Sequence, residues 1–332
     1  MYYRTLGSTD LVISELGFGA FGIGGNRHGN SYGSTDDTES IRAIHRALEL
    51  GCTFFDTANV YGHGHSELLI GMALRKAGEF RNVVVATKGG CRYDVPGGQD
   101  FSPEHLTAAV EASLRRLGRE TIDLYQLHNP SFHLLREGTI FHALDELRSS
   151  GKIRYAGVSV HSIEEGLECL THSVCATIQV VHNVFSLLRP GQSIEVLLTA
   201  ARNAGVGVIA REPLANGFLT GRRDIGETFE RGDIRADFTE DVRRVRLALA
   251  EVIRPRTVNG PTLAQMALRY VLDHPAVTTT IVGVKTVAQV EENFSSVSLP
   301  SFTDLYAAHL DAGASREQAC AELKSEMSTK LH

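Results

Sequence analysis

The chain has 332 residues, of which 42% are hydrophobic and 22% are charged, and its formal net charge is -6 at pH 7. These values are those of an ordinary globular protein, long enough for one barrel or two smaller domains. The negative balance argues against a general nucleic-acid binder, because a phosphate backbone is engaged by a positive surface. Three basic pairs are interpreted as solvated helix faces: Arg115-Arg116, Arg222-Arg223 and Arg243-Arg244.

The cysteines and the hydropathy pattern bear on the cellular compartment. Five cysteines occur without CxxC spacing, which favours a reduced, intracellular protein. The amino terminus lacks the pattern of a signal peptide, and no apolar run approaches the ~20 residues that cross a bilayer. We therefore expect a cytoplasmic protein without a membrane partner.

The amino-terminal region predicts a hairpin and contains one glycine motif. Strand-like runs at residues 2–6 and 11–13 flank a polar Gly-Ser-Thr-Asp turn, which predicts a β-hairpin. A GxGxxG pattern follows at residues 17–22. It leads into a glycine-rich polar stretch, whereas a Rossmann fold needs the motif to open a helix, so we do not favour that fold.

Strand-like and helix-like segments then alternate. The predicted strands are residues 15–20, 52–56, 83–87, 122–127, 153–158, 176–180, 206–210 and 279–282. The predicted helices are residues 36–51, 66–76, 103–117, 138–150, 162–171, 192–203, 262–273 and 287–294. Eight strands that alternate with helices predict an α/β protein with a closed (β/α)8 TIM barrel.

Two segments depart from simple alternation. The connection after the seventh strand, residues 211–260, is long and includes a charged helix at 239–254, and a connection of this length is usually functional. The chain also continues past the eighth helix with an extra C-terminal helix. We predict a single domain over residues 1–332, composed of a hairpin cap (1–14), the barrel (15–298) and a tail (299–332).

Titratable side chains end three successive predicted strands. These are Asp56, Lys88 and His128. The carboxyl ends of barrel strands share one rim, so the three side chains are expected to meet there. Tyr61, on the loop after Asp56, can reach the same place.

This set of residues suits the protonation of a carbonyl oxygen. A phenol with a pKa of about 10 becomes a better acid beside the ammonium of Lys88, and Asp56 can keep a buried Lys88 charged. A neutral His128 can donate a hydrogen bond to the carbonyl. Because side chains carry no hydride, a nicotinamide or flavin has to supply it.

The motifs around these residues resemble the aldo-keto reductase superfamily. They are Asp56-Thr57-Ala58, Tyr61-Gly62, Ser66-Glu67, Lys88 and the run that ends in His128, and the resemblance extends from Arg4 to Asn293. It implies a (β/α)8 barrel that binds NAD(P)H in extended form without a Rossmann domain. It also implies that Tyr61 is the general acid, that Asp56 and Lys88 tune it, and that His128 orients the carbonyl.

The resemblance also assigns cofactor residues. Ser159 and Gln179 correspond to the pair that holds the carboxamide, and Arg211 to the side chain that stacks on the nicotinamide. The loop over the pyrophosphate corresponds to residues 213–221, with Leu214, Gly217, Leu219 and Gly221. The adenosine end corresponds to Gly283, Lys285, Gln289, Glu292 and Asn293. A 2′-phosphate against Lys285 favours NADPH over NADH.

Three positions depart from the family pattern. Val160 stands where the family commonly has Asn, which removes one carboxamide contact. Asn129-Pro130 follows His128 in place of a pattern that ends in Asp, and His182 replaces a frequent Tyr. A zinc site built on His63 and His65, with Cys91 or His161, is not favoured, because alternate histidines on a glycine-rich loop are a poor tetrahedral set.

We therefore expect an NADPH-dependent reductase of an aldehyde or ketone, with sugars and secondary metabolites as candidate substrates. Two alternatives remain open: oxidation of a sugar or alcohol with NAD(P)+, and a cofactor-binding regulatory or structural protein on the same barrel. The substrate-determining loops are predicted at residues 24–34, 89–101 and 221–238, together with the tail from 301. The oligomeric state and the substrate are not determined by the sequence.

Overall fold

The computed structural model describes residues 1–79, 82–95, 98–188, 193–254 and 260–307. Eight parallel strands close into a barrel in chain order, and the last strand pairs with the first, which confirms the predicted (β/α)8 fold. The barrel strands are β3 (Leu16–Gly19), β4 (Phe54–Asp56), β5 (Val84–Gly89), β8 (Ile122–His128), β9 (Ile153–Ser159), β10 (Cys175–Val181), β11 (Gly207–Arg211) and β12 (Thr279–Gly283).

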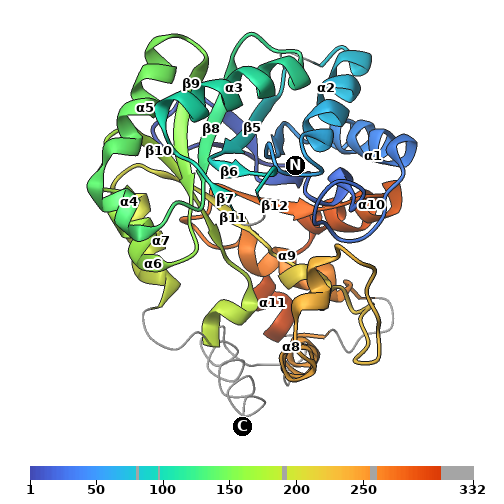
Figure 1. Cartoon of the computed structure of the whole chain (residues 1–332). Helices are drawn as coiled ribbons and strands as arrows, with labels where there is room; N and C mark the ends of the chain where they lie inside the picture. The colour runs from blue at the N-terminus through green and yellow to red at the C-terminus, as the bar shows by residue number, and fades with distance from the viewer. Residues whose placement is uncertain (80–81, 96–97, 189–192, 255–259, 308–332) are drawn as a thin grey trace.

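Helices surround the barrel (Figure 1). The eight helices that follow the barrel strands are α1 (Asp37–Glu49), α2 (His65–Ala77), α3 (Pro103–Leu117), α5 (Thr139–Ser149), α6 (Ile163–Cys169), α7 (Ile194–Asn203), α9 (Leu263–Leu272) and α10 (Val287–Phe294). Their starts follow the capping residues: Asp36 accepts a hydrogen bond from Glu39 N at the start of α1, and Ser102 accepts one from His105 N at the start of α3.

The hydrophobic core has two layers, as a barrel requires. Side chains that face outward from the strands pack beneath the helices. Inside the barrel, Phe54, Leu124, Ile209 and Ile281 form a smaller apolar layer. The amino-terminal hairpin, β1 (Tyr3–Thr5) with β2 (Val12–Ser14), contributes Leu6, Leu11 and Ile13 to this inner layer. Apolar contacts therefore fill the barrel interior below the carboxyl ends of the strands, where the polar residues are concentrated.

Several connections carry structure that the sequence did not predict. The loop after β5 contains a short antiparallel pair, β6 (Cys91–Arg92) with β7 (Gly98–Gln99). An additional helix, α4 (Phe132–Glu137), begins after Ser131, whose side chain accepts from Leu134 N. Short 3₁₀ segments lie at Gly22–Gly24, Val184–Leu188, Ala215–Thr220, Ile234–Asp237 and Ser295–Ser298, and the third of these is kinked at Asn216 and Gly217.

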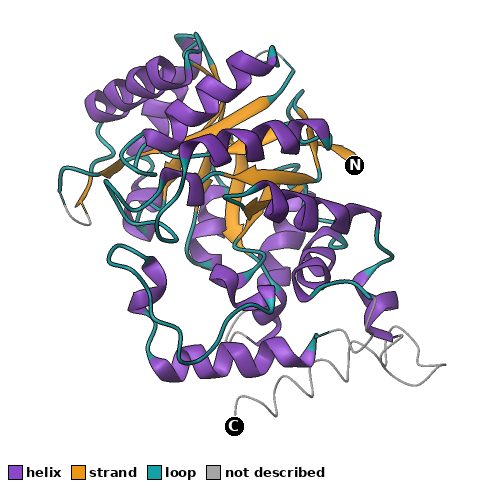
Figure 2. Ribbon diagram, turned by 90° about the vertical axis from the view of Figure 1, so that its right-hand side faces the viewer, coloured by secondary structure: helices purple, strands orange, loops and turns teal. Residues whose placement is uncertain are grey.

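The long connection after β11 and the carboxyl-terminal tail agree with the sequence in part. The predicted charged helix is α8 (Glu240–Val252), with Thr239 as its cap. In the tail, α11 (Phe302–Ala307) begins where an extra helix is predicted, and the predicted continuation over residues 308–332 lies outside the described residues. Figure 1 and Figure 2 show α8 below the barrel, at the lower end of the molecule.

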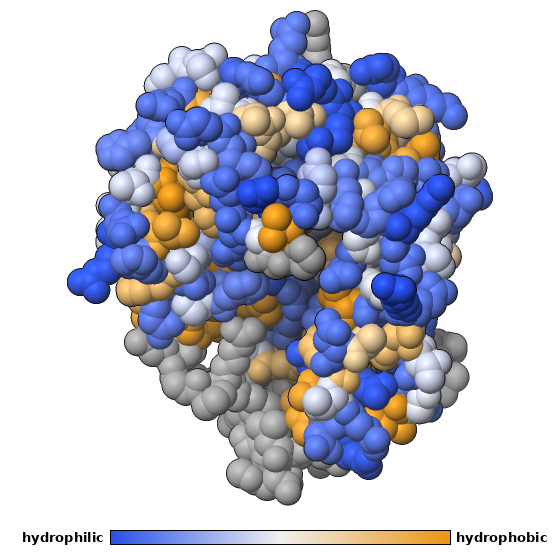
Figure 3. All heavy atoms as spheres, viewed as in Figure 1, coloured by the Kyte–Doolittle hydropathy of each residue, from blue (hydrophilic) through white to orange (hydrophobic). Residues whose placement is uncertain are grey.

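The surface is mixed in character. The face shown in Figure 3 is mainly hydrophilic, and its hydrophobic residues form separate patches. Among the helices of the described ranges, none combines the length and hydropathy that a bilayer crossing requires.

Candidate active site

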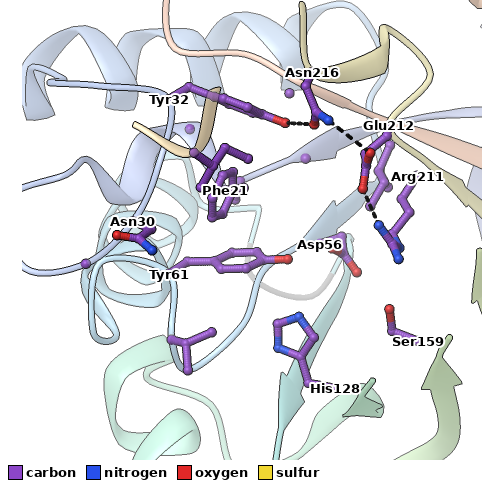
Figure 4. Close-up of a pocket in the computed structure, with 18 of the residues that line it drawn as sticks. Phe21, Asn30, Tyr32, Asp56, Tyr61, His128, Ser159, Arg211, Glu212 and Asn216 are labelled. Carbon is purple, nitrogen blue, oxygen red and sulfur yellow. Dashed lines mark hydrogen bonds and ion pairs between the residues drawn. The ribbon is translucent and has the colours of Figure 1, made fainter. Parts of the chain in front are cut away.

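A cavity of about 900 Å³ opens at the carboxyl ends of the barrel strands, where barrel proteins place their ligand sites. Eleven of the predicted site residues line it: Asp56, Tyr61, His128, Ser159, Gln179, Arg211, Leu214, Gly217, Gly283, Lys285 and Gln289. Figure 4 shows the phenol of Tyr61, the ring of His128 and the hydroxyl of Ser159 turned toward the same space. Leu219, Gly221, Glu292 and Asn293 are not among the lining residues.

Lys88 lies beneath the cavity and joins Asp56 to Tyr61. Its Nζ is paired with Asp56 Oδ1, donates to Thr57 O at 2.9 Å, and lies 3.3 Å from Tyr61 Oη. Lys88 is 0% exposed and Asp56 is 1% exposed. A buried charge needs a charged partner and satisfied hydrogen bonds, and these contacts supply both.

Local sequence brings the tyrosine over this pair. Gly62, with φ of 59°, allows the loop to turn, and a Cβ added there would lie 2.2 Å from Gly24 O, so only glycine fits. Tyr61 packs edge-on between two rings, with centroid distances of 5.0 Å to Phe21 and 5.9 Å to His128. The turn at Gly62 and the packing of these rings therefore hold the phenol in a fixed position above Lys88.

The electrostatics of Tyr61 differ from the expectation drawn from its residue type. Burial raises the pKa of Tyr61, and although the charge of Lys88 pulls in the opposite direction, the net shift is upward. Burial alone would lower the pKa of Lys88, but Asp56 and Tyr61 together raise it. Near neutral pH the structure therefore holds a protonated phenol above a protonated amine.

His128 is held in its neutral form. Burial lowers its pKa well below the ordinary value, and the charges of Lys88 and Arg211 lower it further. A neutral imidazole carries one N–H and can donate a hydrogen bond without adding a charge. This is the form that the sequence interpretation requires.

The lowered pKa of His128 predicts a pH-dependent stability. The folded state takes up its proton less readily than the unfolded chain, so stability is fully present above the unfolded pKa of about 6.5 and falls as the pH drops below it. Between pH 7.5 and 5.5 we expect His128→Asn to lose about 1 kcal/mol less unfolding free energy than the wild type. Urea unfolding at both pH values measures this, with His142→Asn on an exposed position of α5 as the control. Equal pH dependence of the wild type and the His128 variant would contradict the assignment.

The two residues predicted to hold the carboxamide already have protein partners. Ser159 Oγ donates to Asn129 Oδ1 at 2.9 Å, and Gln179 Nε2 donates to Asp56 Oδ2 at 2.8 Å. Both side chains still border the cavity. Because the nitrogen of Gln179 is engaged, its amide oxygen is the atom that remains for a ligand N–H.

Arg211 lies at the predicted nicotinamide position, at the end of β11. It forms an ion pair with Glu212, and its Nη2 donates to Val160 O at 3.2 Å. Its Nε is buried and has no hydrogen-bond partner within the described part of the chain. Glu212 in turn accepts from Asn216 Nδ2 at 3.3 Å (Figure 4). The guanidinium is thus held in place by the loop that follows it.

At the predicted adenosine end, Lys285 and Glu292 already have protein partners. Lys285 Nζ donates to Tyr32 O at 2.8 Å and to Ser34 O at 2.9 Å, so its ammonium ties the first connecting loop to β12. Glu292 is paired with Arg222. The contact of Lys285 with a 2′-phosphate stays a prediction, and it requires these carbonyl contacts to be shared or broken.

Two arginines that the sequence interpretation did not assign to the site line the same cavity, Arg223 and Arg235. Arg235 is paired with the buried Asp233, and Arg223 with Glu227. The Nε of Arg223 is buried without a hydrogen-bond partner among the residues described. Interpreting Arg222-Arg223 as a solvated helix face was wrong for Arg223, because this segment is an irregular loop that folds over the cavity. The residue type of Arg223 alone did not indicate that it lines the cavity.

Backbone strain marks other site residues that were missed. Five non-glycine residues of the described chain have positive φ, and four of them line the cavity: His63, Asn129, Glu212 and Asn216. Such conformations cost free energy and gather at functional sites. As for metal ligands, the described residues contain no group of three or more His, Cys, Asp or Glu side chains placed to hold an ion, and His65 contacts Asp37 instead.

Fold and site geometry together define a class of protein: closed parallel barrels in which a tyrosine above a buried Lys–Asp pair and a neutral histidine border one cavity. Comparison with known proteins gives the family. A family model described as "Aldo/keto reductase family" matches residues 16–313. The chain therefore belongs to the aldo/keto reductase family of oxidoreductases, and the resemblance inferred from the sequence is confirmed.

Individual relatives support this placement. "Aldo-keto reductase YhdN" of Bacillus subtilis is 32% identical over 299 residues, which cover 88% of this chain and 87% of the relative. "L-glyceraldehyde 3-phosphate reductase" of Escherichia coli K12 is 31% identical and covers 94% of this chain and 92% of the relative. Among solved structures, the holo form of aldo-keto reductase AKR11C1 from Bacillus halodurans has a TM-score of 0.74 at 28% identity, covering 99% of this chain and 96% of that chain. The glycerol dehydrogenase AKR11B4 from Gluconobacter oxydans has a TM-score of 0.72 at 30% identity, covering 94% of this chain and 97% of that chain.

Proposed function

We propose that this protein reduces the carbonyl group of a small aldehyde or ketone with NADPH. The observation that carries the proposal is Lys88, fully buried, with Asp56 on one side and Tyr61 Oη at 3.3 Å on the other. This arrangement holds a positive charge next to the only atom of Tyr61 that can release a proton. The tyrosinate that forms when the proton leaves is stabilised by that charge.

Each residue then has one role in the reduction. His128 donates a hydrogen bond to the carbonyl oxygen and directs it toward the phenol, in its neutral form. Tyr61 Oη donates its proton to the same oxygen as negative charge develops there. Lys88 remains charged throughout because Asp56 is its counterion. The bound nicotinamide supplies the hydride.

The residues around the cavity fit a dinucleotide with phosphate groups. Arg211 and Arg223 line the cavity, and each has a buried Nε without a partner in the described ranges, which a ligand in the cavity can satisfy. Arg235 and Lys285 add positive charge to the same wall. We propose that Arg223 and Arg235 hold the cofactor phosphates, and that Ser159, Gln179 and Arg211 hold the nicotinamide end.

Replacement of one arginine tests the cofactor assignment. Arg223→Met is expected to weaken NADPH binding about tenfold or more, since a hydrogen bond to a charged group contributes ~1.5–3 kcal/mol. Fluorescence titration with NADPH and NADH measures the effect. Arg244→Met is a matched control, because Arg244 also pairs with a glutamate four residues away but lies exposed on α8. A loss for both nucleotides places Arg223 at the pyrophosphate, a loss for NADPH alone places it at the 2′-phosphate, and unchanged titrations contradict the assignment.

Turnover is tested with purified protein, NADPH and a panel of carbonyl compounds, followed by the loss of cofactor absorbance. The names of two relatives, a glyceraldehyde-phosphate reductase and a glycerol dehydrogenase, direct the panel to short hydroxylated aldehydes and ketones first. The second name also favours a test of the reverse reaction, alcohol oxidation with NADP+, which becomes more favourable at higher pH because it releases a proton. Tight NADPH binding with no turnover in either direction would instead support a regulatory role.

A further inference from the structure

The second oxygen of Asp56 is held by two amides, one from β8 and one from β10. Gln126 Nε2 donates to Asp56 Oδ2 at 3.1 Å and Gln179 Nε2 donates to it at 2.8 Å. The two amides also contact each other, with 3.3 Å between Gln179 Nε2 and Gln126 Oε1. Gln126 is 0% exposed and Gln179 is 1% exposed. The carboxylate is thus bound on one oxygen by Lys88 and on the other by the amide pair.

The placement of Gln126 follows from the strand register. It lies on β8 two residues before His128, so both side chains face the barrel interior. Its register partner on β5 is Lys88. One layer lower, Leu124 belongs to the apolar interior. A buried amide in this layer is unfavourable unless it is hydrogen-bonded, and the carboxylate of Asp56, which only accepts, requires the nitrogen to face it.

We propose that Gln126 is a positioning residue for the proton donor. By fixing the plane of the Asp56 carboxylate, it holds the other oxygen against Lys88, and so keeps the ammonium within reach of Tyr61 Oη. The role of Tyr61 as the acid belongs to the proposed function, on which this inference rests. Without Gln126, Oδ2 keeps only the hydrogen bond from Gln179, so the carboxylate plane is less firmly fixed and Lys88 is held less precisely against the phenol.

The first test replaces the amide with an apolar side chain of similar shape. Gln126→Met is expected to lower kcat about tenfold while KM for the carbonyl compound and the dissociation constant of NADPH stay within about twofold of the wild type. Leu124→Met changes the same strand one layer lower and is expected to keep wild-type kinetics. A wild-type kcat for Gln126→Met, or an equal loss in both variants, would overturn the proposal.

The second test introduces a charge. Gln126→Glu places a carboxyl about 3 Å from Asp56 Oδ2, and two carboxylates that close cannot both ionise near neutral pH. As the shared proton leaves with rising pH, the extra negative charge next to Lys88 weakens Tyr61 as an acid. We expect a new descending step in the pH profile of kcat that is absent from the wild type and from Gln126→Met. An unchanged profile would count against the contact and its role.

A measurement without turnover separates this inference from the proposed function. In Gln126→Glu the folded protein holds the shared proton up to a higher pH than the unfolded chain does, in which a glutamate has a pKa of about 4.3. The contribution of this proton to the free energy of unfolding is therefore fully present below a pH of about 4.3 and is lost as the pH rises through the folded pKa. Urea unfolding from pH 4 to 8 should show this loss in Gln126→Glu only. If the wild type reduces no carbonyl compound while this loss is observed, the proposed function fails but the contact stands. If the wild type is active and neither the loss nor the kcat change is observed, the inference fails alone.

Discussion

Tyr61→Phe is expected to lower kcat for carbonyl reduction by about 10²- to 10⁴-fold, the usual contribution of a general acid. The substitution removes one oxygen atom and the only proton that Tyr61 can donate. Its ring keeps the edge-on contacts with Phe21 and His128. Initial rates with saturating NADPH measure the loss.

Cofactor binding distinguishes a lost acid from a damaged site. The dissociation constant of NADPH should stay close to the wild-type value in Tyr61→Phe, because the residues proposed to hold the nucleotide come from other strands and from the loop after β11. Tyr93→Phe is the matched control. It also removes a phenolic hydroxyl from the cavity wall, but the ring of Tyr93 is exposed and stacks on His63. Full turnover by Tyr61→Phe would show that the proton comes from another group.

The barrel and the four residues at its rim could be predicted because each signal is local. Buried strands end in Asp56 and His128, and the strand at Lys88 continues by one residue, so a reading of strand ends alone places these three side chains on one rim. Tyr61 follows on a loop too short to leave the rim. Capping residues such as Asp36 and Ser102 gave helix starts to within one residue.

Other parts of the site could not be predicted because they depend on contacts across the barrel. The sequence shows no partner for the ammonium of Lys285, but in the folded protein it donates to two carbonyl oxygens of the first connecting loop. Arg223 belongs to a loop whose path is set by tertiary packing. The pKa of Tyr61 was expected to fall beside an ammonium, and it rises because burial, which the sequence does not show, outweighs that charge. Gln126 lies in the run that ends in His128 but was given no role there, and only the closed barrel, with β5 in register with β8, places it beside Asp56.

Lys88→Met is expected to be the most destabilising single substitution in the site. It removes the positive partner of Asp56, whose side chain borders the cavity but is only 1% exposed. Leaving one member of a buried ion pair unpaired costs about 3–5 kcal/mol of unfolding free energy. The two amides on Asp56 Oδ2 reduce this cost but cannot replace the charge. Chemical denaturation measures the difference.

The double variant Asp56→Asn with Lys88→Met separates an unpaired charge from a lost side chain. An asparagine at position 56 keeps an amide oxygen that can accept from Gln126 and Gln179, and it carries no charge that needs a partner. We therefore expect the double variant to unfold at a higher urea concentration than Lys88→Met, although both members of the ion pair have been replaced. Both variants should lose most of their activity, because neither keeps a positive charge beside Tyr61 Oη. A double variant less stable than Lys88→Met would mean that the hydrogen bonds from Gln126 and Gln179 stabilise the Asp56 carboxylate without Lys88, and the ion pair would then have little part in holding the site together.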